Sequence, residues 1–225
     1  ERKMVFVKKI AVIYTSLGPL VESFYKVLKE TLDECEIIRI ADDSLIRDVK
    51  KLGAPDENIK KRTFLHIESA IEAGADMVII ACSSVGEVAQ EADAKYPVPV
   101  VRIDEGMMDR ALDTGDRIGV IASLGTTITP TVNFLQAKAA QRGKDPRIVS
   151  CVAEGAYEAL NAGDSAKHDA LITEAAKKLA KEADVILLAQ GSMARLEEPL
   201  NKVIPVPVLS SPKNCALAVK KALGL

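Results

Sequence analysis

One stretch decides the fold: Gly74-Ala-Asp-Met-Val-Ile-Ile-Ala-Cys-Ser-Ser-Val-Gly86. Its apolar run, residues 77–81, has the length of a buried parallel strand and leads directly to Cys82 and two serines. A helical pattern follows, so we expect the cysteine at the carboxyl end of a strand, beside the amino terminus of the next helix. Ligands bind at that edge of an open α/β sheet, and the positive end of a helix favours a thiolate there.

The same pattern returns 108 positions later as Ala183-Asp-Val-Ile-Leu-Leu-Ala-Gln-Gly-Ser-Met-Ala194, with Gln190 in the place of Cys82. Two further pairs of strand-like segments keep that spacing: residues 9–15 with 117–123, and residues 97–101 with 205–209. Buried strands often look alike by chance, but a constant offset over three segments indicates internal duplication.

Strands and helices are expected to alternate along the whole chain, which is typical of parallel sheets covered by helices. The expected strands are residues 9–15, 35–40, 77–81, 97–103, 117–123, 147–151, 185–189 and 205–209. The expected helices are residues 21–32, 59–73, 85–95, 104–112, 129–141 and 165–182. Residues 42–58 are polar and contain Pro55, and are expected to form a loop with one short helix at most.

The expected fold class is therefore α/β, with two similar doubly wound lobes at residues 1–112 and 113–225. Each lobe is expected to be a four-stranded parallel sheet flanked by helices. Pseudo-two-fold symmetry would relate the lobes and place the site in the cleft between them, with the C-terminal helix packing across onto the first lobe. Cys82 and Gln190 would then lie on opposite sides of one ligand.

The composition excludes several classes of protein. With 225 residues, 48% of them hydrophobic and 28% charged, the chain has the composition of a folded globular protein. A net charge of −2 with interspersed signs provides no basic stripe, so nucleic acid is not an expected partner. No apolar run is long enough to cross a bilayer and no signal-peptide pattern is present, so we expect no membrane partner and a cytoplasmic location. Four widely spaced cysteines indicate neither a disulfide framework nor a metal site.

Together, these motifs resemble the aspartate/glutamate/hydantoin racemase superfamily. The family's first motif is usually Ala-Cys-Asn-Thr and its second Gly-Cys-Thr-His or Gly-Cys-Ala-Gly-Met; this chain has Ala81-Cys-Ser-Ser84 and Ala189-Gln-Gly-Ser-Met193. The resemblance covers residues 10–16, 75–86, 103–106, 118–126 and 184–194. It implies a homodimeric isomerase without a cofactor, in which two cysteines move a proton on opposite faces of the carbon next to a carboxylate.

Gln190 changes what the resemblance implies, because a carboxamide forms hydrogen bonds but neither takes nor gives a proton near neutral pH. One thiol can still protonate an enolate left by decarboxylation of a malonate-like or keto acid, as in the arylmalonate decarboxylases. It can add to an activated alkene or carbonyl, which resembles the maleate isomerases. It can also pair with another acid or base, for which the candidates are Tyr14, Glu105, Glu154 and His66. A non-catalytic protein that binds small carboxylates is a further alternative.

The expected catalytic residue is Cys82, and the expected substrate is a small carboxylate. The residues expected to bind it share strand-end positions and the means to donate hydrogen bonds: Tyr14, Thr15, Ser16, Ser83, Ser84, Thr126, Thr127, Gln190, Gly191 and Ser192. The hydroxyls of Ser83, Ser84 and Thr126 are also typical of helix caps.

The remaining cysteines and histidines are expected to be structural. Cys35, Cys151 and Cys215 are predicted to be small buried packing residues. His66 is expected to be structural in its helix, and His168 to face solvent.

Overall fold

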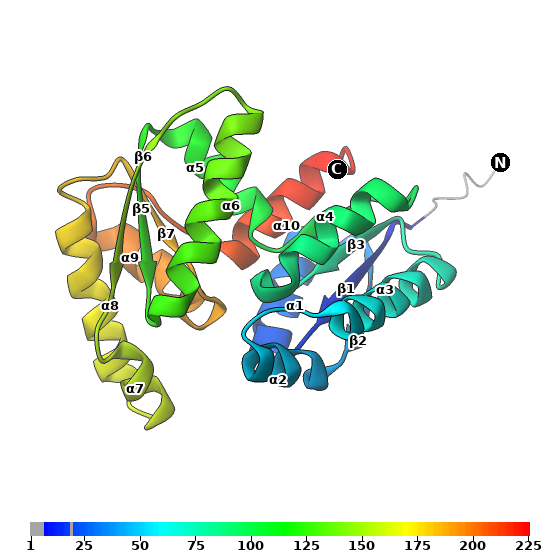
Figure 1. Cartoon of the computed structure of the whole chain (residues 1–225). Coiled ribbons are helices and arrows are strands. Elements are labelled where there is room, and N and C mark those ends of the chain that lie inside the picture. Colours follow the sequence, from blue (N-terminus) through cyan, green and yellow to red (C-terminus); the bar gives the residue numbers. More distant parts are fainter. Residues whose placement is uncertain (1–6, 19) are drawn as a thin grey trace. The chain divides into compact units, whose positions relative to one another are not determined.

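The structure divides into two compact units, each built on one parallel sheet (Figure 1). It is a computed structural model that describes residues 7–18 and 20–225. The first unit extends to Ile103 and also includes Ala216–Leu225, and the second is Asp104–Cys215. The predicted α/β class and the two four-stranded sheets are confirmed. In the described residues, no helix combines the length and the apolar character needed to cross a membrane.

The first sheet has the strand order β2-β1-β3-β4, all parallel. Its strands are β1 (Lys9–Tyr14), β2 (Glu36–Ala41), β3 (Met77–Ile80) and β4 (Val100–Arg102). Its helices are α1 (Leu20–Thr31), α2 (Asp43–Leu52), α3 (Glu57–Glu72) and α4 (Gly86–Lys95), with the short 3₁₀ turn η1 (Ser83–Val85) before α4. Apolar side chains of α2, α3 and α4 form a core with those of β1 and β3.

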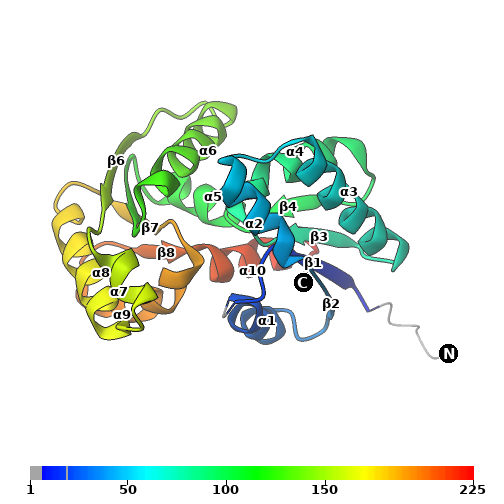
Figure 2. The ribbon, with the colours of Figure 1, turned by 60° about the horizontal axis from the view of Figure 1, so that its bottom comes forward.

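The second sheet repeats this order as β6-β5-β7-β8. Its strands are β5 (Arg117–Ala122), β6 (Arg147–Val152), β7 (Val185–Leu188) and β8 (Val208–Ser210). The helices are α5 (Glu105–Thr114), α6 (Ile128–Gln141), α7 (Ala156–Asn161), α8 (Ser165–Leu179), α9 (Glu197–Val203) and α10 (Ser211–Ala222), with 3₁₀ turns η2 (Gly125–Thr127) and η3 (Gly191–Leu196). Helices α5 and α6 lie on one face of this sheet and helices α7, α8 and α9 on the other (Figure 2). Apolar side chains of both groups pack against the sheet.

The duplication predicted from the sequence is visible in the strand registers. Ile10 of β1 lies opposite Met77 of β3, and Ile118 of β5 lies opposite Val185 of β7, each 108 positions after its counterpart. The amino ends of these strands are also joined alike. The Asp76 carboxylate accepts a hydrogen bond from Lys9 N at 2.8 Å, and the Asp184 carboxylate accepts one from Arg117 N at 2.9 Å. The same hydrogen bond from a strand N–H to an aspartate side chain therefore joins β1 to β3 and β5 to β7 at equivalent positions.

Helix α2, with ten residues, is the one short helix that the expectation for residues 42–58 allowed. The Asp42 side chain caps its start by accepting a hydrogen bond from Ser44 N at 3.0 Å, and Gly53 ends it with a left-handed φ of 85°. Only Leu45 and Val49 are buried on this helix. Such a narrow apolar stripe on a polar segment is easily read as a loop.

Helix α5 belongs to the second unit, whereas the sequence suggests a boundary after residue 112. Met107, Met108, Ala111 and Leu112 pack with the apolar side chains of β5 and β7. The last part of α10 belongs conversely to the first unit, where Lys220 Nζ donates to the carbonyl oxygen of Thr31 at 3.1 Å. The chain order would assign α5 to the first half and the end of α10 to the second, but their contacts place each in the opposite unit.

Candidate active site

Cys82 stands two residues beyond the last residue of β3, at the carboxyl edge of the first sheet. Ala81 N still donates to Ile13 O of β1 at 2.9 Å, and Cys82 itself keeps an extended backbone with φ −155° and ψ 116°. The 3₁₀ turn η1 begins at the next residue. All four residues of β3 are buried, but the Cys82 side chain is partly exposed. The strand therefore presents the thiol at the edge where α/β sheets bind ligands.

The serines after Cys82 are not N-caps. The N-cap positions of η1 and α4 are occupied by Cys82 and Val85, and neither makes a side-chain capping bond within the described residues. Ser83 is partly exposed and Ser84 is exposed. The capping interpretation is therefore wrong for these two residues, and their binding to a ligand stays a prediction.

The other candidates of the first unit lie at the end of β1. Tyr14 and Thr15 are 1% and 3% exposed, and Ser16 is partly exposed. The Tyr14 ring packs edge-to-face on Phe24, with 6.5 Å between ring centroids. Tyr14 is thereby an integral part of the packing beside the strand end, and its contact with a ligand stays a prediction.

Gln190 has the same local position in the second unit as Cys82 in the first. Ala189 N donates to Ile121 O of β5 at 2.9 Å, and Gln190 continues the extended backbone with φ −135° and ψ 142° before η3. Gly191 and Ser192, which open η3, are exposed. The two strand ends are thus built alike and differ in the side chain that they present.

The Gln190 side chain has a defined orientation because of Ser123, a residue that sequence reasoning did not select. Its Oε1 accepts hydrogen bonds from Ser123 N at 2.6 Å and from Ser123 Oγ at 2.8 Å. Ser123 is 4% exposed. The 108-residue offset, which places Ser123 at the position of Thr15, was a signal that could have identified it. Since the acceptor oxygen is used, the amide NH₂ is the group that Gln190 can offer to a ligand.

The threonines of the second unit lie in and after η2. Thr126 is exposed and Thr127 partly exposed. Thr127 is the N-cap residue of α6 but makes no side-chain capping bond within the part of the chain that the structure describes. The capping interpretation of Thr126 is wrong, since that position belongs to Thr127; contact of either hydroxyl with a ligand stays a prediction.

Arg102 brings a buried cation to the carboxyl edge of the first sheet. It is the last residue of β4, lies opposite Ile80 of β3, and is 6% exposed. Its guanidinium packs against Gly86 so closely that a Cβ at Gly86 would come 2.3 Å from Arg102 Cζ. Gly86 is the residue at which η1 passes into α4. The turn that follows Cys82 therefore packs against the guanidinium of Arg102. Sequence reasoning did not select this residue either.

The four candidates for a second acid or base have different surroundings. Besides the buried Tyr14, Glu105 accepts a hydrogen bond from Lys138 Nζ at 2.8 Å, and Glu154 is exposed beside β6. His66 Nε2 lies 3.1 Å from Asp42 Oδ2 at the end of β2, which agrees with a structural role. Of these groups, Glu105 is already engaged in an ion pair and His66 in a hydrogen-bonding contact.

Asp42 is the centre of a charged network that also includes Arg62, Ser44 and His66. Arg62 donates to Asp42 Oδ2 at 2.8 Å and to Asp48 Oδ2 at 2.7 Å. Burial alone would raise the pKa of Asp42, but hydrogen bonds from Ser44, Arg62 and His66 outweigh burial and hold that pKa well below its usual range. The network ties α2 and α3 to the end of β2.

Asp42→Asn is expected to lower the free energy of unfolding by about 2 kcal/mol at pH 7, because asparagine caps α2 equally well but cannot pair with Arg62. A carboxyl whose pKa is lower in the folded state stabilises the fold above its unfolded pKa of about 4, and this contribution is lost as the pH falls toward the folded pKa. The free energy of unfolding, measured with urea at pH values from 7 to 3, should therefore fall less in the variant than in the wild type. Asp43→Asn is the control, because Asp43 is a partly exposed neighbour that pairs with Arg47 on the same helix and not with Arg62. Equal behaviour of the two variants would contradict the network.

His168 and Cys151 differ from their predicted environments. His168 is fully buried rather than solvent-facing, since it belongs to the buried stripe of α8 with Ile172 and Ala176. Its Nδ1 lies 2.8 Å from the Asp169 carboxylate, which also accepts from Arg195 of η3 at 2.7 Å. Cys151 is partly exposed because β6 is an edge strand.

Cys35 and Cys215 are buried, as predicted. Burial raises the pKa of the thiols of Cys35, Cys151 and Cys215, so all three are less readily ionised than an ordinary thiol. None of them stands at the end of a central strand.

The fold and these residues define a class of protein: a duplicated α/β chain in which equivalent strand ends carry a thiol in one unit and an oriented carboxamide in the other. Residues 21–219 match the family model of the Asp/Glu/hydantoin racemases. The chain belongs to this family, as the sequence motifs predicted. A comparison with curated proteins finds no match.

Solved structures of racemases share the fold. Allantoin racemase from Klebsiella pneumoniae has a TM-score of 0.71 at 20% identity, over 97% of this chain and 89% of that one. Glutamate racemase RacE1 from Bacillus anthracis has a TM-score of 0.73 at 18% identity, over 96% and 82%. Aspartate racemase from Picrophilus torridus has a TM-score of 0.74 at 16% identity, over 96% and 94%. At these identities the likeness establishes the fold and leaves the substrate open.

Proposed function

We propose that this chain is a cofactor-independent isomerase of the racemase type, acting at the carbon next to the carboxylate of a small acid. Cys82 is its single catalytic thiol, and Gln190 donates a hydrogen bond to the same ligand. The observation that carries the proposal is the pair of bonds from Ser123 to Gln190 Oε1. They orient a neutral donor at the strand end that is equivalent to that of the thiol.

In the proposed reaction, the thiolate takes the proton from the carbon next to the carboxylate. The electron pair of the broken C–H bond moves into the carboxylate and forms an enediolate, whose oxygen accepts a hydrogen bond from the Gln190 amide. Donors placed where negative charge develops stabilise such an intermediate. The thiol then returns a proton to the same carbon, which exchanges its hydrogen. Where the acid carries a β,γ double bond conjugated with the enediolate, the proton goes to the γ-carbon instead, and the double bond moves to the α,β position, which completes an isomerisation.

A single thiol works from one face of the substrate, and this distinguishes it from a two-cysteine racemase. Inversion needs an acid on one face and a base on the other, and Gln190 can be neither. With α-amino or α-hydroxy acids in D₂O, we therefore expect the enzyme to exchange the α-hydrogen with retention of configuration. Proton NMR follows the exchange, and chiral chromatography follows the configuration.

Gln190→Cys supplies the missing acid and is expected to convert exchange with retention into racemisation, at about 10²-fold above the wild-type rate. Gln190→Ala is the matched control, because it removes the amide without adding a thiol. Exchange without inversion in both variants would show that the two strand ends do not act on opposite faces of one carbon.

Alkylation of Cys82 by iodoacetamide, with and without small mono- and dicarboxylates, tests the site independently of turnover. Protection by a carboxylate together with α-hydrogen exchange supports the proposed isomerase. Protection without any exchange favours the non-catalytic carboxylate-binding protein. If no amino, hydroxy or keto acid of a panel protects Cys82 or exchanges its α-hydrogen, the proposal is contradicted.

The same geometry also favours a second candidate, a decarboxylase of malonate-like or keto acids. Loss of CO₂ from such an acid leaves an enolate, which needs one proton from one face and hence one thiol, while the Gln190 amide stabilises the enolate oxygen. Release of CO₂ from substituted malonates, with a product of one handedness, would favour this candidate over the isomerase.

A further inference from the structure

Glu197 is a buried carboxylate that the proposed chemistry does not use. It is the first residue of α9, directly after η3, and it is 7% exposed. Its Oε2 accepts a hydrogen bond from Ser210 N at 2.8 Å and a second one from Ser210 Oγ. Ser210 is the last residue of β8 and lies opposite Leu188 of β7. Glu197 therefore joins the end of η3 to the strand beside β7.

Gln190, at the other end of η3, makes the same kind of contact. Its Oε1 accepts hydrogen bonds from Ser123 N at 2.6 Å and from Ser123 Oγ at 2.8 Å. Ser123 directly follows β5 and Ser210 ends β8, and these two strands are the neighbours of β7 on either side. The segment 190–197 is thus bonded at both ends, to the end of β5 at Gln190 and to the end of β8 at Glu197.

The residues between the two ends are attached as well. Met193 is 0% exposed and packs in the core of this unit. Arg195 Nη1 donates to Asp169 Oδ1 of α8 at 2.7 Å. Close-packed segments transmit strain, because their side chains have no empty space into which to relax. A displacement of Glu197 would therefore reach Gln190.

One contact of α9 is shared by both units and so belongs to the fold. Asn201 Oδ1 accepts a hydrogen bond from Val208 N at 3.0 Å, which joins α9 to β8. In the first unit, 108 positions earlier, Asp93 Oδ1 accepts one from Val100 N at 3.0 Å, which joins α4 to β4. This contact is the same whether a cysteine or a glutamine follows the preceding strand.

The contact of Glu197 is not shared. The equivalent positions of the first unit, 108 positions earlier, hold Ala89 in place of Glu197 and Arg102 in place of Ser210. Alanine has no side-chain oxygen, so the first unit cannot form this bond. The Glu197–Ser210 contact therefore accompanies Gln190 and is not a general requirement of the fold.

We infer that Glu197 is a positioning residue for Gln190. By joining the end of η3 to β8, it fixes the segment 190–197 and holds the Gln190 amide NH₂ in one direction before a ligand binds. A donor that is already in place stabilises negative charge without reorganisation at the moment of reaction. The inference rests on the proposed function, in which this amide stabilises the enediolate.

The order parameter of the Gln190 side-chain amide, from ¹⁵N relaxation, tests the inference without turnover. In the full labelled chain, the signals of this amide are identified by their loss in Gln190→Ala. The order parameter is expected to be about 0.8 in the wild type and to fall below about 0.6 in Glu197→Ala, because the segment is released from β8. Glu197→Gln should keep the wild-type value, since a carboxamide oxygen accepts two hydrogen bonds, as that of Gln190 does from Ser123.

Glu198→Ala is the matched control for these relaxation measurements. Glu198 is the exposed next residue of α9, and its carboxylate pairs with Lys202 on the same helix, so the order parameter should not change. Ser210→Ala removes only the hydroxyl donor and is the milder variant, which should lower the order parameter less than Glu197→Ala. If the order parameter keeps its wild-type value in both of these variants, or in the one that folds, Glu197 does not position Gln190.

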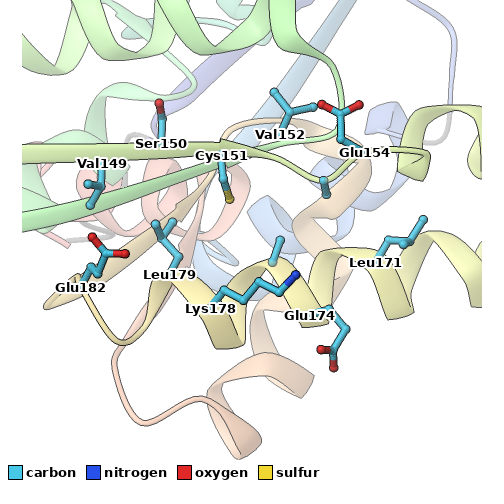
Figure 3. Close-up of a pocket in the computed structure, with 12 residues that line it drawn as sticks. Val149, Ser150, Cys151, Val152, Glu154, Leu171, Glu174, Lys178, Leu179 and Glu182 are labelled. Carbon is cyan, nitrogen blue, oxygen red and sulfur yellow. The ribbon is translucent and has the colours of Figure 1, made fainter.

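A groove of about 430 Å³ between β6 and α8 provides a comparison within the same unit. Cys151, Leu171 and Lys178 line it, and none of the residues 190–197 does (Figure 3). Sodium malonate is expected to shift the amide signals of Gln190 and to leave the backbone signals of Cys151 and Leu171 in place. Shifts confined to Cys151 and Leu171 would contradict the ligand site on which the inference rests.

The kinetics of α-hydrogen exchange distinguish positioning from a merely structural role. The amide acts on the enediolate rather than on the bound acid, so Glu197→Ala should lower kcat about tenfold and leave KM within about twofold. Glu197→Gln should restore kcat. A wild-type chain that exchanges no α-hydrogen contradicts the proposed function, and the order parameter still decides whether Glu197 positions the amide. Exchange with an unchanged kcat in Glu197→Ala overturns the inference and leaves the proposed function intact.

Discussion

Replacement of Cys82 by serine is expected to reduce turnover of the small acid about 10³-fold while leaving its binding within about threefold. The serine hydroxyl keeps a hydrogen-bonding group at the end of β3, but it is a far weaker acid than a thiol and does not ionise at neutral pH. Proton transfer by a positioned side chain contributes about 10²- to 10⁴-fold to a rate, and the full contribution is lost here. Initial rates give the turnover, and calorimetric titration gives the affinity.

Cys151→Ala is the control for this substitution, because it removes the other partly exposed thiol. Its turnover should equal that of the wild type. If Cys82→Ser keeps its turnover, the thiol has no part in the chemistry. If it loses affinity and turnover together, Cys82 contributes to binding rather than to proton transfer.

Gly86→Ala is expected to lower the free energy of unfolding by about 2 kcal/mol, although alanine is the better helix former. The backbone of Gly86 has a helical φ of −62°, which alanine adopts without backbone strain. The new Cβ would come 2.3 Å from Arg102 Cζ and 2.5 Å from Arg102 Nε. Because Arg102 is 6% exposed, its guanidinium cannot move aside without losing buried contacts. Displacing it also shifts the turn after Cys82, so turnover should fall about tenfold.

Gly125→Ala is the matched control, since Gly125 opens η2 in the second unit and its nearest neighbour would be Val152 Cγ2 at 3.9 Å. A double-mutant cycle of Gly86→Ala with Arg102→Ala isolates the contact: once the guanidinium is removed, the alanine should cost almost nothing. Equal stability of Gly86→Ala and Gly125→Ala would show that the guanidinium adapts freely.

Much of the fold could be predicted from the sequence because buried parallel strands are short, apolar and rich in β-branched residues. Residues 77–81 and 185–189 were expected as strands, and the structure places β3 and β7 there. The shared spacing of 108 residues indicated the duplicated strand order. Helices whose apolar stripe is narrow were harder to predict: α2, which buries Leu45 and Val49 alone, was expected only as one short helix without bounds, and the six-residue α7 was not expected.

Environments that depend on strand order were predicted less well. Cys151 reads as a buried residue by its type, but β6 is an edge strand and leaves it beside a groove. His168 reads as a polar residue on a charged helix, but the helical period turns it inward with Ile172. No local pattern says which neighbour a strand or helix face will receive.

In the candidate site, too, local features could be predicted from the sequence, whereas contacts between distant residues could not. The sequence by itself determined that Cys82 and Gln190 follow equivalent strands, because the apolar period and the 108-residue offset are local properties of the chain. Only the tertiary structure decided that Ser123, 67 positions away in the sequence, binds the side-chain oxygen of Gln190. It also decided that the Arg102 guanidinium packs against Gly86 in the turn after Cys82. The physical reason is that parallel strands bring their carboxyl ends to one edge of a sheet, where hydrogen bonds and packing join residues that the chain keeps far apart.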